Sequence, residues 1–313
     1  MKYKVFIDGA EGTTGLKIHQ YFQKRDDIDL LKIDQEKRKD LDERLSLIKQ
    51  ADISFLCLPD AAAREIAAAA PAECRILDTS TAHRTDPSWV YGMPELCEGQ
   101  REKIKNSNRV AVPGCHATGV ILLIKPLLEA GLVPADYPFC ACSLTGYSGG
   151  GKKMIAQYES PERQRGNMGG RDILCSPRQY GIAQAHKHLP EIIAATGISS
   201  APAFSPIVAD YYSGMEVTVP IKVDGLTKAD VEKAVAGYYK DQPLVTVKEA
   251  LDEGGFIAAG QLSGTNRLEI TVEGNDDNIL LVAVYDNRGK GASGAAIQNM
   301  NIMLGIDETK GLV

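Results

Sequence analysis

The first fifteen residues constrain the fold more than any other stretch of the chain. Residues 5–7 are apolar, Gly9, Gly12 and Gly15 follow at intervals of three, and LKIHQYFQKR then has the pattern of an amphipathic helix. This order predicts a buried parallel strand, a glycine-rich turn and a helix. Such a turn lets the backbone approach a pyrophosphate, whose charge the helix N-terminus binds. The spacing is GxxGxxG instead of the usual GxGxxG, so a tight turn without a ligand is the alternative.

Further strand-like segments follow in the first half of the chain, and helical patterns such as DAAAREIAAAA separate them. They are LLKID at 30–34, ADISFLCLP at 51–59, CRILDTS at 74–80 and NRVAVPG at 108–114. Strands that alternate with helices join through right-handed crossovers into a parallel sheet. We therefore predict an α/β fold that begins with a Rossmann-type, parallel-sheet nucleotide-binding domain.

The pattern changes after about residue 130. Strand-like segments with antiparallel character occupy residues 138–145, 216–223, 266–274 and 278–286. The turn-rich EGNDDN joins the last two and indicates a hairpin. A helix is predicted over TKADVEKAVAGYYKDQ, which opens with Thr and has Asp three residues later. These features predict a second domain of the α+β class.

The last helical run, GAAIQNMNIMLG, has apolar residues at helical spacing and is expected to be amphipathic. We predict that it returns from the second domain to the first. The expected domains are residues 1–114 with 289–313, which bind the nucleotide, and residues 115–288, which carry catalysis and oligomerisation. A helix that only completes the core is the alternative reading.

Composition and charge exclude several classes of protein. The chain has 313 residues and a formal charge of −6 with a pI near 5.5, so it has no broad basic face for nucleic acid. It shows no signal-peptide pattern and no apolar run long enough for a membrane span, which predicts a cytoplasmic protein. Seven cysteines without a CxxC pair fit neither a disulfide framework nor a zinc ribbon. Most cysteines are expected to be reduced and buried, and Cys57, Cys140 and Cys142 to be inert packing residues.

One cysteine stands apart, in PGCHATG at 113–119. Cys115 follows a predicted strand and begins a predicted helix. The helix dipole and the free amides at such a position stabilise a thiolate, which makes the sulfur a nucleophile near neutral pH. Ligands of open α/β sheets bind beyond the carboxyl ends of the strands, where both Cys115 and the glycine loop are expected. The alternative is a small buried residue at a helix start.

Two stretches of the second half carry further possible chemistry. TGYSGGGKK at 145–153 is rich in amides, hydroxyls and lysines and could bind an anion, although a flexible turn has the same composition. AQAHKHLPEI contains His186 and His188, one of which could be an acid and base beside a cysteine nucleophile. A metal site or two surface histidines without function are the alternatives. His83 in STAHRTD and His116 beside Cys115 are also expected near the predicted site, with bystander residues as the alternative.

Together these motifs resemble a known family. GAEGTTG, DTSTAHR, YGMPE, PGCHATG, TGYSGGGKK, HKHLPEI and NRGKGASGAAIQNMN occur in this order from residue 9 to residue 301. They resemble N-acetyl-γ-glutamyl-phosphate reductases of arginine biosynthesis, in the shorter of that family's two types. Members fold as an NADP-binding Rossmann domain plus an α+β domain, similar to aspartate-semialdehyde dehydrogenase and glyceraldehyde-3-phosphate dehydrogenase. The resemblance also implies a homodimer or homotetramer.

The resemblance implies an oxidoreductase that reduces an acyl phosphate to an aldehyde. The thiolate of Cys115 would attack N-acetylglutamyl phosphate, phosphate would leave, and hydride from NADPH would reduce the resulting thioester. His188 corresponds to the family's acid/base residue and His186 to a residue that positions substrate. Ser148 and Gly149 are candidates for binding the phosphate or the oxyanion. Arg84 could face a carboxylate or phosphate of the substrate.

The cofactor implied by the resemblance is NADP(H). Asp34 lies where an acidic side chain usually holds the ribose hydroxyls of NAD, whereas Lys37, Arg38 and Lys39 could neutralise a 2′-phosphate. Members of the family prefer NADPH to NADH, so the resemblance implies NADPH as the cofactor of this chain. The predicted cofactor contacts are Gly9, Gly12, Thr13, Thr14, Gly15, Lys37, Arg38, Pro59, Ser80, Lys290 and Gly291.

Two other functions stay open at this point. A related reductase of aspartyl phosphate or of carrier-linked aminoadipyl phosphate would use the same cysteine and histidine. A regulatory protein that only senses NADPH would need neither a nucleophile nor an acid/base partner. The presence of both Cys115 and the His186–His188 pair therefore favours the enzyme.

Overall fold

The computed structural model of the chain describes residues 2–166, 172–251 and 254–313. The chain forms two compact units, which are treated separately below. The first unit comprises Met1–Pro113 together with Ala292–Val313, and the second comprises Gly114–Gly291. The chain therefore leaves the first unit directly before Cys115 and re-enters it close to the C-terminus.

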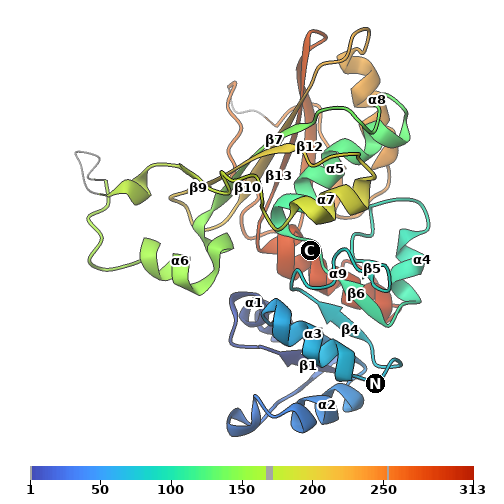
Figure 1. Ribbon diagram of the computed structural model, residues 1–313, viewed down its shortest axis with the longest axis vertical. Coiled ribbons are helices and arrows are strands. Elements are labelled where there is room, and N and C mark those ends of the chain that lie inside the picture. The colour runs from blue at the N-terminus through green and yellow to red at the C-terminus, as the bar shows by residue number, and fades with distance from the viewer. Residues whose placement is uncertain (1, 167–171, 252–253) are drawn as a thin grey trace. The chain divides into compact units, whose positions relative to one another are not determined.

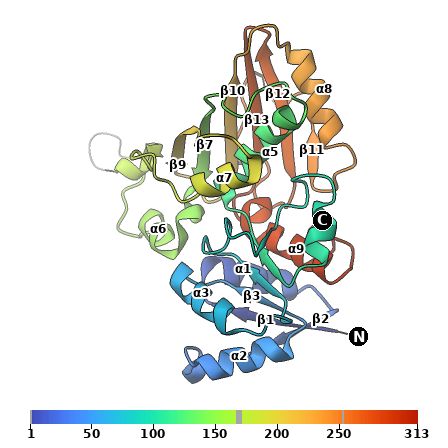
Figure 2. The same ribbon diagram turned by 45° about the vertical axis from the view of Figure 1, so that its right-hand side comes forward.

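The first unit is built on a six-stranded parallel sheet with the order β2-β1-β3-β4-β6-β5 (Figures 1 and 2). Its strands are β1 (Tyr3–Asp8), β2 (Ile28–Leu31), β3 (Ile53–Leu56), β4 (Ile76–Asp78), β5 (Val90–Tyr91) and β6 (Arg109–Ala111). The strand order reverses between β1 and β3, which is the point where doubly wound folds bind nucleotides. The predicted parallel-sheet domain is confirmed.

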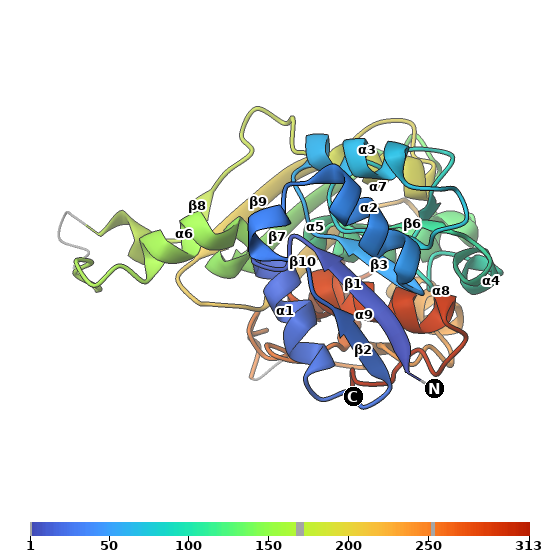
Figure 3. The ribbon, with the colours of Figure 1, turned by 90° about the horizontal axis from the view of Figure 1, so that it is seen from below.

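Helices cover both faces of this sheet. Figure 3 shows α2 (Leu41–Gln50) and α3 (Asp60–Ala69) on one side, and α1 (Thr13–Phe22) and α9 (Gly294–Met303) on the other. A short α4 (Gln100–Lys105) also contacts α9. Apolar side chains of α2, α3 and the strands fill one interior, including Phe6, Leu47, Ile48, Leu56, Ile66 and Ile76. Burial of these side chains is the main favourable term that holds the layers together.

The expectation that the last helix is amphipathic was wrong. Every residue of α9 is buried, and Gln298, Asn299 and Asn301 are each 0% exposed. Their amides form hydrogen bonds in the interior: Gln298 donates to Glu95 at 2.9 Å, and Asn299 donates to the Gly92 carbonyl at 2.7 Å. A buried amide is tolerated when partners satisfy it, so polar residues in a helix need not mark a solvent face.

The second unit is built on a seven-stranded mixed sheet with the order β11-β12-β13-β10-β7-β9-β8. Its strands are β7 (Cys140–Gly146), β8 (Arg178–Gln179), β9 (Ala203–Ala209), β10 (Met215–Ile221), β11 (Val245–Val247), β12 (Leu268–Asn275) and β13 (Asn278–Tyr285). The predicted hairpin is confirmed, with Asn275 opposite Asn278. The expected antiparallel character holds for most pairs, whereas β7 with β9 and β11 with β12 are parallel. The predicted α+β class is confirmed.

Helices α5 (Cys115–Glu129), α7 (Leu189–Thr196) and α8 (Lys228–Tyr238) pack together against one face of this sheet (Figure 2). Helix α6 (Gly151–Tyr158) lies apart from them, beyond β7 (Figure 1). The predicted cap of α8 is confirmed, because Thr227 and Asp230 form a capping box. Helix α5 is apolar over most of its length and buried from His116 to Ile124. Its first turn is therefore fixed rigidly against the sheet.

The expectation of buried cysteines was wrong in part. The described cysteines are all free, as predicted, but Cys140 and Cys142 are exposed and the others are half-buried. Residues of β7 alternate between the two faces of the sheet, so Ala141 and Ser143 face the helices while the two cysteines face away. Alternation identifies two faces but does not say which one is covered. Burial raises the pKa of the Cys57 thiol to about 12, which fits the inert role predicted for that residue.

Candidate active site

Cys115 is the first residue of α5, as predicted, and Gly114 is the N-cap. The hydroxyl of Tyr285 donates to the Cys115 carbonyl at 2.6 Å and accepts from the Gly119 amide at 3.1 Å. The hydroxyl thus bridges the Cys115 carbonyl and the Gly119 amide, which a regular α-helix would join by a direct hydrogen bond. A Cβ atom at Gly119 would lie 2.6 Å from this hydroxyl, which explains the glycine in PGCHATG. Tyr285 therefore fixes the backbone that carries the nucleophile.

A second contact shapes the surroundings of Cys115. Residues Gly289–Ser293 form a π-helical turn that directly precedes α9. A Cβ atom at Gly291 would lie 3.1 Å from the Cβ of Cys115 and 3.1 Å from the Asp286 carbonyl oxygen. The backbone at Gly291 therefore lies against the cysteine side chain. Lys290, its neighbour, is buried within the same turn.

His188 lies at the start of α7 and is 4% exposed. Its Nε2 is 4.0 Å from Oε1 of Glu191, while Oε2 of Glu191 accepts a 3.0 Å hydrogen bond from the Gly114 amide. Glu191 is 1% exposed. A single buried carboxylate thus contacts both the histidine and the residue directly before Cys115. The sequence reasoning missed Glu191, although its place three residues after His188 puts both on one helix face.

His186 is half-buried and lies beside His188, with the ring centroids 4.7 Å apart. Its Nδ1 accepts a 3.2 Å hydrogen bond from the His188 amide. Burial, followed by the nearby charge of Lys187, lowers the pKa of His186. A neutral His186 then carries its proton on Nε2, where it can donate to a bound ligand. The two predicted histidines thus occupy one site.

The predicted anion loop is ordered. Tyr147–Gly150 form a short 3₁₀ helix, in which Ser148 is buried and accepts a 3.1 Å hydrogen bond from Asn287. Gly149 packs beside the same amide, since a Cβ there would lie 3.3 Å from the Asn287 nitrogen. The amide of Ser148 donates to the Tyr212 carbonyl at 3.0 Å. That amide is therefore engaged within the protein, and the Ser148 hydroxyl is the better candidate for a ligand contact.

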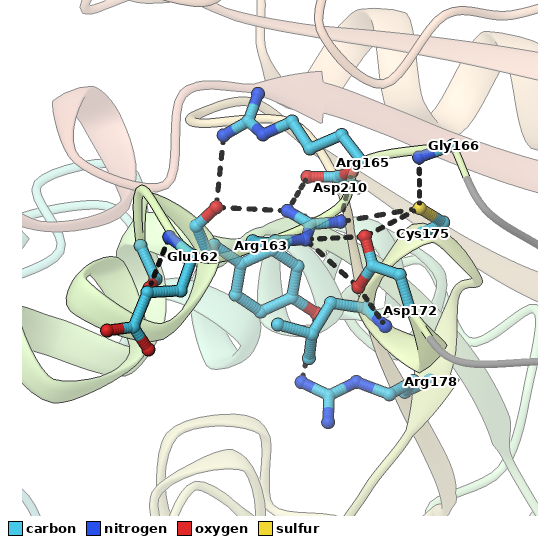
Figure 4. Close-up of polar contacts among 11 residues, drawn as sticks. Glu162, Arg163, Arg165, Gly166, Asp172, Cys175, Arg178 and Asp210 are labelled. Atoms are coloured by element: carbon cyan, nitrogen blue, oxygen red, sulfur yellow. Dashed lines mark hydrogen bonds and ion pairs between the residues drawn. The ribbon is translucent and has the colours of Figure 1, made fainter.

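An arginine network joins Arg163 to Asp172 and Asp210 (Figure 4). The guanidinium of Arg163 makes two hydrogen bonds to Asp210, of 2.9 and 2.6 Å, and a 2.8 Å bond to Asp172. Asp210 directly precedes the Tyr211–Tyr212 segment whose carbonyls bind the loop amides. Arg163 also donates to the Tyr158 carbonyl at 3.0 Å, and the Tyr158 ring stacks on Tyr147 at 4.6 Å. The sequence offered no signal for this network, because its members are 9 and 47 residues apart.

In the first unit, the glycine loop has the geometry of a phosphate-binding turn. Gly9 has φ +84°, and a Cβ there would lie 2.4 Å from the Cys57 carbonyl oxygen. A Cβ at Gly15 would lie 2.6 Å from the Gly9 carbonyl oxygen. Helix α1 starts at Thr13 without a side-chain cap and without an acidic residue in its first turn. Its N-terminal amides and positive dipole end are therefore suited to a bound anion.

The residues after β2 bear on the choice of cofactor. Asp34 caps a short 3₁₀ turn by accepting a 2.9 Å hydrogen bond from the Glu36 amide. Lys37 and Arg38 are exposed; Lys37 lies 3.5 Å from Glu43, and Arg38 lies 3.8 Å from Glu11 and donates to Gln35 at 3.2 Å. Asp34 is exposed as well, and one of its carboxylate oxygens has a backbone partner.

The DTSTAHR motif forms a hydrogen-bonded cluster after β4. Asp78 is buried and accepts hydrogen bonds of 2.9 and 2.8 Å from the amide and hydroxyl of Ser80, and it lies 2.6 Å from Nδ1 of His83. Arg84 donates to the carbonyls of Val112 and Thr79, at 2.9 and 3.2 Å. In this structure Arg84 therefore joins the ends of β4 and β6. Pro59 is exposed at the start of α3.

The predicted site residues thus fall into two groups. The first unit contains Gly9, Gly12, Thr13, Thr14, Gly15, Lys37, Arg38, Pro59, Ser80 and Arg84, and the second contains Cys115, Ser148, Gly149, His186, His188, Lys290 and Gly291. Among the described residues, no group of three or more His, Cys, Asp or Glu side chains could hold a metal ion. None of the helices described is both long and apolar enough to span a bilayer.

Two family models match successive parts of the chain. Residues 4–107 match the family described as semialdehyde dehydrogenase, NAD binding domain, and residues 115–287 match semialdehyde dehydrogenase, dimerisation domain. The fold is similar to that of aspartate semialdehyde dehydrogenase II from Vibrio cholerae complexed with ASA, with a TM-score of 0.71 and 17% identity over 97% of this chain and 98% of that one. It is also similar to aspartate semialdehyde dehydrogenase with NADP from Candida albicans. For that structure the TM-score is 0.67 and the identity 13%, over 96% of this chain and 98% of that one. The fold and site thus define a semialdehyde dehydrogenase-type protein.

Closer relatives narrow this class. The chain is 43% identical to N-acetyl-gamma-glutamyl-phosphate reductase 2 from Nostoc sp., over 99% of both chains. It is 43% identical to N-acetyl-gamma-glutamyl-phosphate reductase from Brucella anthropi, over 97% of this chain and 99% of that protein. The chain belongs to the N-acetyl-gamma-glutamyl-phosphate reductase family. The resemblance found in the sequence motifs is confirmed.

Proposed function

We propose that the protein reduces N-acetyl-L-glutamyl 5-phosphate to N-acetyl-L-glutamate 5-semialdehyde, with NADPH as reductant and release of phosphate, in arginine biosynthesis. Family membership supports the substrate. The observation that carries the mechanism is the arrangement around Glu191, which contacts His188 and the Gly114 amide beside Cys115. A nucleophile at a helix start, with a histidine that shares a carboxylate partner with the preceding residue, supports covalent acyl transfer.

In the first step, the Cys115 thiolate attacks the acyl carbon and the C–O bond to phosphate breaks, which leaves a thioester and inorganic phosphate. The helix dipole at the start of α5 favours the thiolate over the thiol. The Ser148 hydroxyl, held by Asn287, is our candidate donor to the phosphate or to the developing oxyanion. His186 is our candidate for orienting the substrate through Nε2. We also assign Gly149 and Arg84 to substrate binding.

NADPH, when bound, supplies the hydride that reduces the thioester to a thiohemiacetal. His188 then acts on this adduct as an acid and base. It protonates the hemiacetal oxygen as that oxygen gains charge, and it accepts the same proton when the C–S bond breaks to release the aldehyde and the thiolate. Glu191 stabilises the protonated form of His188, since its carboxylate lies 4.0 Å from Nε2.

The residues of the first unit fit this cofactor. The uncapped start of α1 and the turn at Gly9 suit a pyrophosphate, and we assign Gly12, Thr13, Thr14 and Gly15 to it. Lys37 and Arg38 would hold the 2′-phosphate that distinguishes NADPH from NADH. The carboxylate of Asp34 accepts from the Glu36 amide through one oxygen, so our choice of NADPH depends on the two cations and on the family. We further assign Pro59, Ser80, Lys290 and Gly291 to the cofactor.

We also propose a homo-oligomer in the cytoplasm, at least a dimer. The matched family description calls residues 115–287 a dimerisation domain. Within that region, Cys140, Cys142, Ala203 and Pro220 are exposed on neighbouring strands. This face is our candidate for contact with a second copy, and Cys142→Arg should reduce the molecular mass measured by light scattering.

The function is tested most simply in the reverse direction. Purified protein with N-acetylglutamate semialdehyde and NADP should form NADPH only when phosphate is present, and NAD should support a lower kcat/KM. Aspartate semialdehyde serves as the matched control substrate. Equal or better turnover of aspartate semialdehyde would reassign the substrate, and NADPH binding without turnover of any aldehyde would indicate a sensor.

A further inference from the structure

His116 follows the nucleophile directly, and the steps above give it no role. Its side chain is 2% exposed. Nδ1 lies 2.6 Å from the Ser143 hydroxyl of β7, and Nε2 lies 2.5 Å from the Tyr180 hydroxyl that follows β8. Both ring nitrogens are therefore occupied by short polar contacts from two different segments. An imidazole held in this way can neither flip nor rotate without breaking a buried hydrogen bond.

The fixed ring of His116 forms one wall of the histidine site. Its centroid lies 5.5 Å from that of His186 and 5.6 Å from that of His188. Phe204 closes the same cluster, 5.5 Å from His116 and 5.2 Å from His186. The contacts of His186 with both other imidazoles are edge-to-face, the geometry in which ring packing is attractive. The rings of His186 and His188 therefore pack directly against a ring whose two nitrogens are both engaged in polar contacts.

The charge of His116 matters as well. Burial lowers the pKa of His116 to about 3, and electrostatic interaction with His186 and Lys187 acts in the same direction. The ring is thus neutral under all conditions in which the protein would act. A positively charged His116 would oppose protonation of His188, whereas a neutral His116 does not.

We propose that His116 is a positioning residue. Its contacts with Ser143 and Tyr180 fix its ring, and this ring holds those of His186 and His188 in the orientation that the reaction needs. The kinetic consequence rests on the proposed function. The packing itself is a property of the resting protein, so the two can be tested apart. The competing view is that His116 only fills space, in which case a ring of similar size without polar atoms would serve equally well.

Kinetics separate these views through His116→Phe, which keeps a ring and removes both hydrogen bonds. We expect kcat to fall about 10- to 100-fold through displacement of His188, and KM to rise as well through displacement of His186, because small displacements of catalytic groups are costly. Ser143→Ala and Tyr180→Phe should each cost less, and neither should lower kcat further in the His116→Phe background. His19→Phe, the same substitution in α1, is the matched control. A kcat of His116→Phe within twofold of wild type would overturn the proposal.

The pH profile gives a second kinetic readout. The ionisable groups around the cluster are Cys115, Tyr180, His186, Lys187, His188, Glu191 and Tyr285. If His116 positions His188, its substitution should shift the acid limb of kcat/KM, which reports the free enzyme. A substitution that only reduced the folded fraction would lower the whole profile without shifting it, and this result would count against the proposal.

A measurement without substrate tests the packing directly. The chain has only five histidines, so protein labelled with ¹³C at histidine Cε1 should give a spectrum simple enough to assign by substitution. The His116 signal should not titrate between pH 5 and 8. In Tyr180→Phe, and in His116→Phe if it folds, the His186 and His188 signals should broaden or split. Unchanged positions and widths in Tyr180→Phe would overturn the proposal, even if the protein proved to be an active reductase. Broadened signals in a protein without reductase activity would refute only the proposed function.

Discussion

The glycine loop of the first unit and the histidine cluster of the second are built by opposite means. The loop is made of backbone, and its parts lie within seven residues, from Gly9 to Gly15. The cluster is made of side chains that come from α5, β7, β9 and the segment between β8 and α7. A binding site made of backbone loses affinity when side-chain atoms are added to it. A site made of side chains loses activity when their functional groups are removed. The two sites should therefore respond differently to substitution.

The largest expected effect concerns Cys115, which lies beside the cluster in the second unit. Cys115→Ser should reduce turnover by more than about a thousandfold, because a hydroxyl at a helix start does not ionise near neutral pH as a thiol does. NADPH binding, measured by fluorescence titration, should stay within about twofold of wild type. If the variant kept more than about a tenth of wild-type turnover, which is about 1.4 kcal/mol of barrier, Cys115 would not be the nucleophile.

The next effect distinguishes two members of the cluster. His188→Asn should lower kcat by about 10² to 10⁴, the range for loss of a positioned acid and base. His186→Asn should act mainly on KM, since its assigned role is to orient substrate. Steady-state kinetics of both variants provide the check. The reverse pattern would exchange the two assignments, and unchanged kinetics in both would remove the pair from the site.

Adding a single methyl group should break the loop. Gly9→Ala places a Cβ 2.4 Å from the Cys57 carbonyl oxygen, and φ is +84° there. We expect NADPH affinity to fall by more than about tenfold, which is about 1.4 kcal/mol. Gly99→Ala is the matched control, because Gly99 has a similar φ of +74° with nothing within 4 Å of its Cβ position. This control should lose about 1–2 kcal/mol of stability and bind NADPH normally. Equal loss of NADPH affinity in both variants would show that backbone strain at positive φ, and not the contact with Cys57, explains the loss at Gly9.

The smallest effect concerns pH, and it sharpens the contrast because the core of the cluster is titratable. The pKa of His116 is lowered from 6.5 to about 3 in the folded protein. The unfolded chain therefore binds a proton between these values that the folded chain does not. The resulting stability is fully present above pH 6.5 and is lost as the pH falls through this window. Denaturant unfolding of His116→Phe should show a slope of stability against pH that is shallower than wild type by up to about 1.4 kcal/mol per unit. Identical slopes would contradict a buried neutral His116.

The same contrast explains what could be predicted from the sequence. The turn at Gly9, the helix start at Cys115 and the capping box at Thr227 are local, so the residues that cause them are neighbours in the chain. The pairing of Gly114 with Glu191 spans 77 residues, and no local pattern reports it. The buried polar face of α9 was mispredicted because its hydrogen-bond partners, such as Gly92, lie about 200 residues away in the sequence. The periodicity of apolar residues predicts where helices and strands lie in the sequence. The contacts inside a site depend on which helices and strands pack against each other.

The central claim is that Cys115 forms a thioester with the substrate's acyl group, and withholding phosphate tests it most directly. With N-acetylglutamate semialdehyde and NADP alone, hydride transfer can proceed once but the thioester has no phosphate to accept its acyl group. We predict a burst of about one NADPH per active site. Mass spectrometry of the rapidly quenched protein should find one N-acetylglutamyl group on the peptide that contains Cys115. Addition of phosphate should release the group and start steady turnover. Steady turnover with phosphate, but with neither a burst nor an adduct on Cys115 in its absence, would contradict the account.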